Sequence, residues 1–413
     1  MRYLVIFFLL FLSSCHSKRE IKDEILRIDL NEAVNRSQLN ASDFISSIEY
    51  VALETSSQCL LGEAVFASVS ENFILTFSYN GSCLLFSRKG QFIRSIGQRG
   101  NGPQDYLNNS YYVKIDEKSD RIYLMGMDEI VAYTIAGKFV KKLNLIDFYK
   151  KGVLSDRPMH VTHWKENLFC ANMNLNSGKE PLRCVIFTLE GEVVKTFPNH
   201  VFFETEKGRM VRSTLNSDVD IYLYNEQLYF KEILCDTLFR ITDQLDFVPE
   251  IIFDLPGKKM PTNMRGYFKT SPPEYMIRGI HEVDNYLFWF GTLQYLYDKK
   301  KNQLISFEGD PLLNREITAP LPGGATNTRT TSLRGLSNDI DGGLPFAPHH
   351  LSHIQNDQQM ICIYQSYLLK EKLTDEHFAR YKIKDPEAHK RLRNLLENLD
   401  WEDNPVLMIA TFK

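Results

Sequence analysis

The stretch LLFSRKGQFIRSI (84–96) contains a pattern that returns four more times along the chain. The other four copies are VAYTIAGKFVKKL (131–143), VIFTLEGEVVKTF (185–197), LFRITDQLDFV (238–248) and YLYDKKKNQLISF (295–307). Each copy has an aromatic residue (Phe86, Tyr133, Phe187, Phe239, Tyr297), and four positions later a turn residue (Gly90, Gly137, Gly191, Asp243, Lys301). A second apolar run follows the turn, and Gly supplies the positive φ that tight hairpins need, so each copy is predicted to be a β-hairpin.

The five aromatic residues recur at intervals of 47 to 58 residues. Hairpins repeated at roughly this period are typical of a β-propeller, in which four-stranded blades bury their faces by stacking in a ring. The repeat region, about 44–370, has room for six blades, and Met360 to Tyr364 starts the sixth. We therefore predict an all-β, six-bladed propeller. Separate β-sandwiches are the alternative, but they would not repeat one hairpin, and no linker interrupts the run.

The two ends of the propeller, 44–413, are predicted to meet in one blade. The strands 48–53 and 406–413 are expected to pair and close the ring. A helical insert is expected at about 374–400, because Asp385 can cap a helix that has Pro386 in its first turn. Leu392, Leu395, Leu396 and Leu399 follow at helical spacing and are expected to pack on the propeller. The Gly- and Pro-rich segment 309–350 is interpreted as a long loop on one face.

The first fifteen residues indicate export. Arg2 precedes an uncharged run from Leu4 to Leu12, and Ser13 and Ser14 then lead to Cys15. This ending resembles the lipobox of bacterial lipoproteins, which predicts a signal peptide over 1–14, a lipid on Cys15 and a tether over 15–43. An ordinary signal peptide with a chance cysteine is the alternative. Acyl chains would anchor the protein to the outer membrane without spanning it, on its periplasmic or outer face.

The charge balance bears on the partners. The 413 residues include 48 basic and 52 acidic ones, which gives a formal net charge of −4. This balance argues against nucleic acid as a partner, since phosphates require a basic excess. The expected partners are the membrane, through the lipid, and a glycan, peptide or envelope protein. We expect a monomer.

Six cysteines remain after the lipid site: Cys59, Cys83, Cys170, Cys184, Cys235 and Cys362. An even count in an oxidising compartment permits three disulfides. Cys170 and Cys184 flank a turn at 176–178 and can face each other across a hairpin. We nevertheless expect buried free thiols, because a large domain does not need covalent staples.

One segment carries a family resemblance. RSIGQRGNGPQDY (94–106) resembles the strand-end loop of NHL-type propeller repeats. The chain from 44 to 413 is similar to a family of six-bladed β-propeller lipoproteins of anaerobic Gram-negative bacteria, through IEYVALET (48–55), NDIDGGLPFAP (338–348) and DNPVLMIATFK (403–413). The resemblance implies the fold and the compartment, and little about function.

Two segments are candidate ligand sites. The loop 97–105 carries Arg99, Asn101 and Asp105 among glycines whose backbone N–H groups can hold an anion. The alternative, which we favour, is a structural turn. In the second segment Asp339 and Asp341 alternate as Ca²⁺ ligands can, but Asp-Gly-Gly is also a plain turn signal.

Five histidines extend the second candidate site. His349, His350 and His353 can add metal ligands together with His160 and His163 from another blade. Surface histidines are the more common outcome. We therefore expect no cofactor, with Ca²⁺ or Zn²⁺ as the minor alternative.

No catalytic motif stands out, since GxSxG and HExxH are both absent from the chain. We expect a binding or scaffold module that uses the loop-lined face of the propeller. A metal-assisted lyase or hydrolase at the same face is the alternative.

Overall fold

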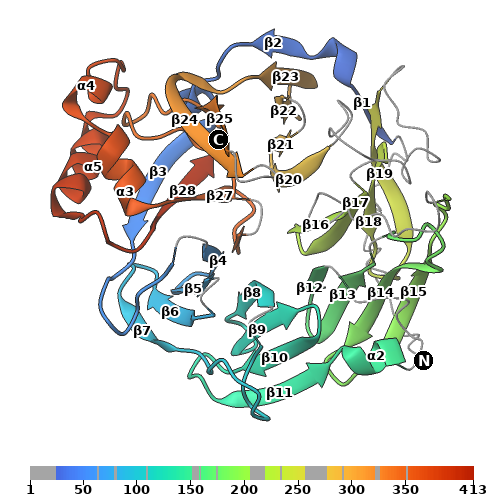
Figure 1. Cartoon of the computed structure of the whole chain (residues 1–413). Coiled ribbons are helices and arrows are strands. Elements are labelled where there is room, and N and C mark those ends of the chain that lie inside the picture. Colours follow the sequence, from blue (N-terminus) through green and yellow to red (C-terminus); the bar gives the residue numbers. More distant parts are fainter. Residues whose placement is uncertain are drawn as a thin grey trace, which may run out of the picture.

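The computed structural model of the chain is a ring of six β-sheets, each forming one blade (Figure 1). It describes residues 25–413 except 63–64, 79–80, 108–109, 151–157, 159, 174, 205–218, 233–234, 256–276, 291–292, 321–325 and 350–351. For residues 110–111, 149, 290, 310–320 and 326–333 the backbone alone is described. The prediction of an all-β, six-bladed propeller is confirmed.

Blades 1 to 5 are antiparallel meanders, in which the first strand lies nearest the ring centre and the fourth at the rim (Figure 1). Blade 1 contains β4 (Val65–Val69), β5 (Phe73–Ser78), β6 (Cys83–Ser87) and β7 (Phe92–Ser95). Blade 2 contains β8 (Ser110–Asp116), β9 (Arg121–Gly126), β10 (Glu129–Tyr133) and β11 (Phe139–Asn144), and is followed by α2 (Ile146–Lys150). Blade 3 contains β12 (His160–His163), β13 (Leu168–Asn172), β14 (Leu182–Thr188) and β15 (Val193–Pro198).

Blades 4 and 5 follow the same plan. Blade 4 contains β16 (Val219–Tyr224), β17 (Gln227–Glu232), β18 (Thr237–Ile241) and β19 (Phe247–Asp254). Blade 5 contains β20 (Arg278–Val283), β21 (Tyr286–Phe290), β22 (Gln294–Asp298) and β23 (Gln303–Phe307). Within the described residues, six buried apolar clusters fill the six junctions between neighbouring blades. The stacking of blades therefore supplies the core.

The five repeated hairpins are the third and fourth strands of blades 1 to 5. Gly90, Gly137 and Gly191 have φ of 84°, 80° and 88°, as their turns require. A Cβ on Gly90 would lie 2.1 Å from the carbonyl oxygen of Ala52, so this turn also needs a glycine to approach blade 6.

Asp243 and Lys301 lie in the turns of blades 4 and 5, as predicted, but neither takes the positive φ of the glycines in blades 1 to 3. In blade 4 the residue at positive φ is Leu245 (62°), not Asp243. The residue four positions before this turn residue is therefore Ile241, and not Phe239 as the repeat predicted. In blade 5 Asn302 (50°) takes this conformation next to Lys301. Without a glycine to mark the turn, the pattern gave the wrong register.

Blade 6 joins the two ends of the chain. Its strands are β27 (Gln359–Tyr364), β28 (Val406–Phe412) and β3 (Ile45–Ala52), in that order. The C-terminal strand β28 pairs with both neighbours, so that Met408 lies opposite Cys362 on one side and Tyr50 on the other. The predicted ring closure is thus confirmed.

The N-terminal segment is part of the ring instead of a tether. The strand β1 (Leu26–Asp29) pairs in parallel with β19 at the rim of blade 4, and β2 (Val34–Arg36) pairs with β23 at the rim of blade 5. A 3-10 turn, η1 (Leu30–Glu32), connects them, and α1 (Ala41–Phe44) leads into β3 at the rim of blade 6. We call residues 26–52 the rim belt.

The prediction of a tether over 15–43 is therefore wrong for residues 26–43. The outermost strand of a blade has unpaired N–H and C=O groups that can pair with an extended segment. The mixed charges of residues 26–43 did not indicate that this segment would pair in this way. The predicted signal peptide and Cys15 lie outside the described residues.

The segment expected to be one long loop, 309–350, contains a β-hairpin instead. Its strands are β24 (Asp310–Pro320) and β25 (Thr326–Leu333), which form a separate two-stranded sheet. The β-branched residues of this segment favour strands, although the glycines that flank it indicated a loop. A short strand, β26 (His353–Ile354), follows and pairs in parallel with β4, at the inner edge of blade 1.

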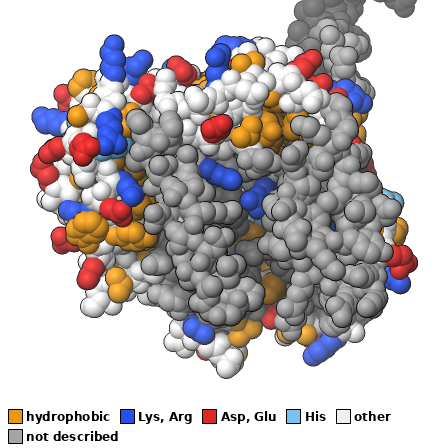
Figure 2. All heavy atoms as spheres, turned by 45° about the horizontal axis from the view of Figure 1, so that its top comes forward, with side chains coloured by type: hydrophobic (Ala, Val, Ile, Leu, Met, Phe, Trp, Pro, Cys, Tyr) orange, Lys and Arg blue, Asp and Glu red, His pale blue; other side chains and the backbone are white. Residues whose placement is uncertain are grey.

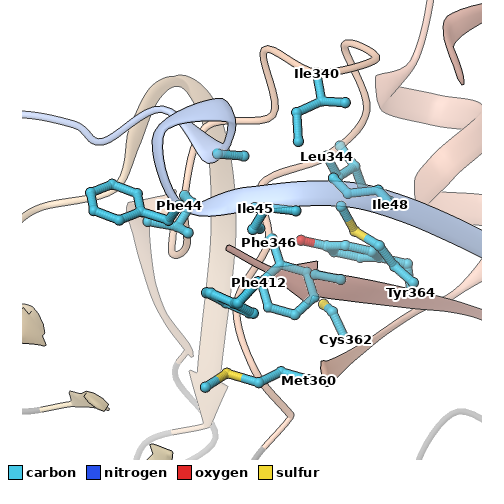
Figure 3. Close-up of a cluster of buried hydrophobic side chains, with 14 of the residues drawn as sticks. Phe44, Ile45, Ile48, Ile340, Leu344, Phe346, Met360, Cys362, Tyr364 and Phe412 are labelled. Carbon is cyan, nitrogen blue, oxygen red and sulfur yellow. The ribbon is translucent and has the colours of Figure 1, made fainter. Parts of the chain in front are cut away.

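The predicted helical insert precedes β28 and contains α4 (Asp375–Phe378) and α5 (Pro386–Asn398). A further helix, α3 (Ser366–Lys372), comes before the predicted bounds of 374–400. The Asp385 side chain caps α5 by accepting from the backbone N–H of Ala388 at 2.9 Å. Leu392 is fully buried in the junction cluster of blades 5 and 6, and Leu395 and Leu396 pack against it. Figure 3 shows the same cluster where side chains of β3, β27 and β28 meet those of residues 340–346.

Residues 336–346 connect the insert to blade 6 and the rim belt. The Asp339 carboxylate accepts from the backbone N–H and hydroxyl of Ser42, at 2.9 and 2.6 Å, at the start of α1. The Asp341 carboxylate accepts from Tyr50 and from the N–H of Gly343. Its other oxygen is buried and has no hydrogen-bond partner in the part of the chain that the structure describes, and burial raises the pKa of Asp341 to about 6.

Deleting residues 406–413 tests the ring closure. Without β28, the strands β3 and β27 lose their shared partner and blade 6 cannot form, so we expect the truncated protein to melt without one cooperative transition in calorimetry. The exposed Trp401→Ala variant, close to β28 in the chain, is the control and should keep a single transition. Unchanged melting of the truncated protein would refute the closure.

Asp341 is expected to make folding stability depend on pH. An aspartate has a pKa of about 4 in the unfolded chain, so between pH 4 and 6 the folded state holds a proton that the unfolded state has lost. The contribution of Asp341 to stability therefore falls as pH rises through this window. In urea unfolding at pH 4 and pH 6.5, Asp341→Asn should remove about 2 kcal/mol of that fall. Asp147→Asn, an exposed change on α2, should leave it intact, and the same fall in both variants would contradict the prediction.

Candidate functional site

The loop 97–105 joins the rim of blade 1 to the first strand of blade 2, and Asp105 holds its shape. The Asp105 carboxylate accepts from the Gln98 side chain at 2.9 Å and from the Gly102 N–H at 2.8 Å. These two bonds lower the pKa of Asp105. A Cβ on Gly100 or Gly102 would lie 2.3 or 2.6 Å from a carboxylate oxygen, which explains both glycines. Asp105 thus already accepts bonds from its own loop.

Two tyrosines fasten the same loop to the blades. Tyr106 donates to the Gly81 carbonyl at 2.8 Å, and Tyr133 donates to the Gln104 carbonyl at 2.6 Å. Arg99 and Asn101 are exposed beside them. The contacts of this loop are those of a structural turn that connects blades 1 and 2.

The candidate site at 338–343 has two different roles inside the fold. Asp339 contacts α1 and Asp341 contacts β3, so the two carboxylates do not converge on a shared ligand. Two histidines that the sequence analysis did not single out support this segment: His377 contacts the Gly342 carbonyl at 2.8 Å and His389 the Asp341 carbonyl at 2.7 Å. Both lie on the helical insert.

The other candidate histidines divide between blades. His349 bonds the hydroxyl of Ser352 at 2.9 Å, whereas His350 lies outside the described residues. His160 bonds Thr162 and stacks on the Tyr112 ring, and burial lowers the pKa of His160 to about 3. Over the described parts of the chain, no three His, Cys, Asp or Glu side chains are placed to share a metal ion.

The innermost strands of the blades surround the ring centre (Figure 1). Three residues on these strands have basic side chains that interact with one another. They are Lys114 on β8, His163 on β12 and His353 on β26, and we call them the central cluster. The Lys114 ammonium lies 3.5 Å from the His163 carbonyl oxygen. Gln355, two residues after His353, donates to the Ile115 carbonyl of β8. Blades 1, 2 and 3 therefore all contribute.

Burial and mutual repulsion disfavour the charged forms of the three groups in the central cluster. Burial, and then Lys114 and His163, lower the pKa of His353 to about 3. Burial and then Lys114 lower the pKa of His163 to about 4, while Asp116 acts in the opposite direction. Burial lowers the pKa of Lys114 to about 8. Near pH 7 the two rings are therefore neutral and the lysine is charged.

The tautomer of His163 follows from its hydrogen bond. Its Nε2 lies 2.9 Å from the Glu166 carbonyl, which only accepts, so Nε2 carries the proton and Nδ1 is a bare acceptor. The ring stacks on Tyr123 with centroids 4.4 Å apart, which fixes its plane. Among the described residues, the Nδ1 atoms of His163 and His353 are both buried without a hydrogen-bond partner. Buried polar atoms of this kind usually bond a partner, so they call for a ligand or a water molecule.

Sequence reasoning singled out both histidines, but as metal ligands, and it missed Lys114. One basic residue in a strand carries no signal by itself. Only the folded propeller brings Lys114 next to the imidazoles of His163 and His353.

The surface shown in Figure 2 carries mixed charges. Over the described part of that face, basic and acidic side chains are interspersed without a large patch of one sign. Among the described residues no helix is both long enough and apolar enough to cross a bilayer.

Comparison with solved structures supports the fold. A putative exported protein from Bacteroides fragilis aligns with a TM-score of 0.62 and 16% identity, over 94% of this chain and 100% of that one. A DUF4221 family member from Bacteroides vulgatus aligns with a TM-score of 0.42 and 11% identity, over 91% and 98% of the two chains. At that TM-score the second likeness carries no argument.

Comparison with sequences gives one family. No curated protein matches this chain at a significant level. The resemblance to NHL-type lipoproteins therefore stays a prediction. Residues 25–411 match the family described as "Domain of unknown function (DUF4934)", from the rim belt to the closing strand, and the chain belongs to that family.

Proposed function

We propose that the protein is an exported, lipid-anchored propeller of the cell envelope that binds a glycan at its central cluster. Export is supported by the apolar N-terminal run ending in Cys15 and by the fold shared with a putative exported protein. The anchor is supported by the small residues directly before Cys15.

The rim belt suggests how such an anchor would hold the ring. The belt begins with Leu26 at the rim of blade 4, eleven residues after Cys15. A chain of that length reaches at most about 40 Å. A lipid on Cys15 would therefore attach the ring to the membrane by its rim and leave the two faces of the propeller accessible.

The single observation that carries the binding role is the pair of buried, unpartnered Nδ1 atoms beside the Lys114 ammonium. The bare Nδ1 of His163 accepts a hydrogen bond, and the Lys114 ammonium donates them. A hydroxyl group can do both, so a ligand with neighbouring hydroxyls satisfies all three groups. An anion suits the cluster less well, because the bare nitrogen of His163 would face it with a lone pair. A peptide or an envelope protein is the alternative ligand.

Lipid anchoring is tested by Cys15→Ala in the full chain expressed in a Gram-negative anaerobe. We expect the wild-type protein to incorporate labelled fatty acid and to enter the detergent phase on Triton X-114 partition, and the variant to do neither. Cys59→Ala is the control and should behave like the wild type. A wild-type protein that stays unlabelled in the aqueous phase would reject the anchor, without bearing on the central cluster.

Glycan binding is tested by calorimetric titration with neutral hexasaccharides of glucose, xylose and N-acetylglucosamine. We expect at least one to bind, and Lys114→Met to weaken it about 10-fold or more, because a hydrogen bond to a charged group is lost. Lys118→Met, whose side chain is 90% exposed at the next turn of the same blade, should not change the affinity.

The same titration has a pH signature. Since the pKa of Lys114 is about 8, wild-type affinity should fall as pH rises past 8, and Lys114→Met should lack this fall. The pKa values of His163 and His353, about 4 and about 3, lie far below this range. If no saccharide binds, or if Lys114→Met binds as well as Lys118→Met, the glycan role is wrong. Binding of a peptide or an envelope protein alone would transfer the role to that ligand.

A further inference from the structure

Cys170 and Cys184 face each other inside blade 3. They lie on the adjacent strands β13 and β14, where Cys170 pairs with Ile186, and Asn172 with Cys184, so the two cysteines are diagonal neighbours. Their sulfur atoms are 3.1 Å apart, and both side chains are fully buried. The turn between the strands therefore brings the sulfurs together, as the sequence analysis considered.

This separation is close to bonding. A disulfide has an S–S length of about 2.05 Å, so the sulfurs need to move by about 1 Å in total. The antiparallel register already holds the two backbones side by side. Two other cysteines have different neighbours: Cys59 donates to the Glu54 carbonyl at 3.1 Å, and Cys235 lies against Asp236 and Thr237.

We infer that Cys170 and Cys184 form a disulfide when the protein folds in an oxidising compartment. This goes beyond the proposed function, because it requires neither a lipid nor a glycan. It also replaces the expectation of free thiols for these two cysteines.

The oxidant is the disulfide of an exported dithiol oxidase, or of glutathione in a test tube. The Cys170 thiolate attacks that disulfide, which breaks and leaves Cys170 in a mixed disulfide. The Cys184 thiolate then attacks the Cys170 sulfur and expels the oxidant's second sulfur as a thiolate. In total two thiols lose two protons and two electrons, and the oxidant's disulfide becomes a dithiol.

Burial determines when the bond can form. Both cysteines belong to the cluster between blades 3 and 4, with Phe197 and Phe230. Burial raises the pKa of Cys184, so little thiolate is available in the folded state. Oxidation therefore has to precede the packing of blade 4 on blade 3. Once formed, the bond is shielded from reductants by the same packing.

Refolding of the full chain tests the bond independently of export. The denatured, reduced protein is refolded with oxidised and reduced glutathione, alkylated, and digested with trypsin without reduction. Cleavage after Lys165, Lys179, Arg183 and Lys195 separates the two cysteines into peptides 166–179 and 184–195. We expect mass spectrometry to find these peptides joined, two hydrogens lighter than their sum, and separated by reductant. Their absence as a linked pair would overturn the inference.

Three controls sharpen the result. Cys59→Ser should keep the linked pair, whereas Cys170→Ser should lose it. If Cys170→Ser does not fold, thiol counting on the denatured wild-type protein still decides, since oxidised refolding should hide two thiols. Protein folded in reductant first, and then given glutathione disulfide, should link at least 10-fold more slowly. Equal rates would show that burial does not control the step.

Discussion

The pairing of β28 with β3 is the interaction on which the rest of the structure depends. It joins residues more than 350 positions apart and gives blade 6 its rim strand. Each blade has two apolar faces and can bury them only against two neighbours, so an open ring would expose the two faces of one of its six junctions. The rim belt adds to this closure, since β1, β2 and β3 cross the edges of blades 4, 5 and 6 in one continuous run. Closure is thus distributed over half of the ring.

Closure also creates the polar centre. First strands of neighbouring blades approach one another there, and side chains bond the backbone of the next blade: Ser68 accepts from Ile115 at 3.1 Å, and Asp220 accepts from Gly279 at 2.5 Å. Lys114 makes a similar contact to blade 3 but keeps a charge that burial disfavours. A buried, charged lysine beside the bare Nδ1 of His163 and the buried ring of His353 is costly. This cost distinguishes the central cluster from the satisfied contacts elsewhere around the centre.

The sequence was informative where one residue type has one structural meaning. Glycines marked the turns of blades 1 to 3 correctly, because few other residues take positive φ, and the terminal apolar strands indicated the closure. The register failed in blade 4, where Leu245 takes that conformation without a glycine. The aspartates at 339 and 341 resembled ligands, yet their partners Ser42 and Tyr50 come from the opposite end of the chain. Such contacts, like the position of Lys114, exist only after the ring has assembled.

Blades 3 and 4 lie away from the closing strand pair of blade 6, and their junction is reinforced differently. Arg183 on β14 forms a buried ion pair with Glu232 on β17, with 2.7 Å between Nε and Oε1. A buried pair of this kind adds little net stability, but removing one partner is strongly destabilising, so it favours one register of the two blades. The sulfur pair lies in the same junction and constrains β13 against β14. A disulfide there would fix the face of blade 3 against which blade 4 packs, before the N- and C-terminal strands have paired. The ring would then close after the packing of blade 4 on blade 3 is already fixed.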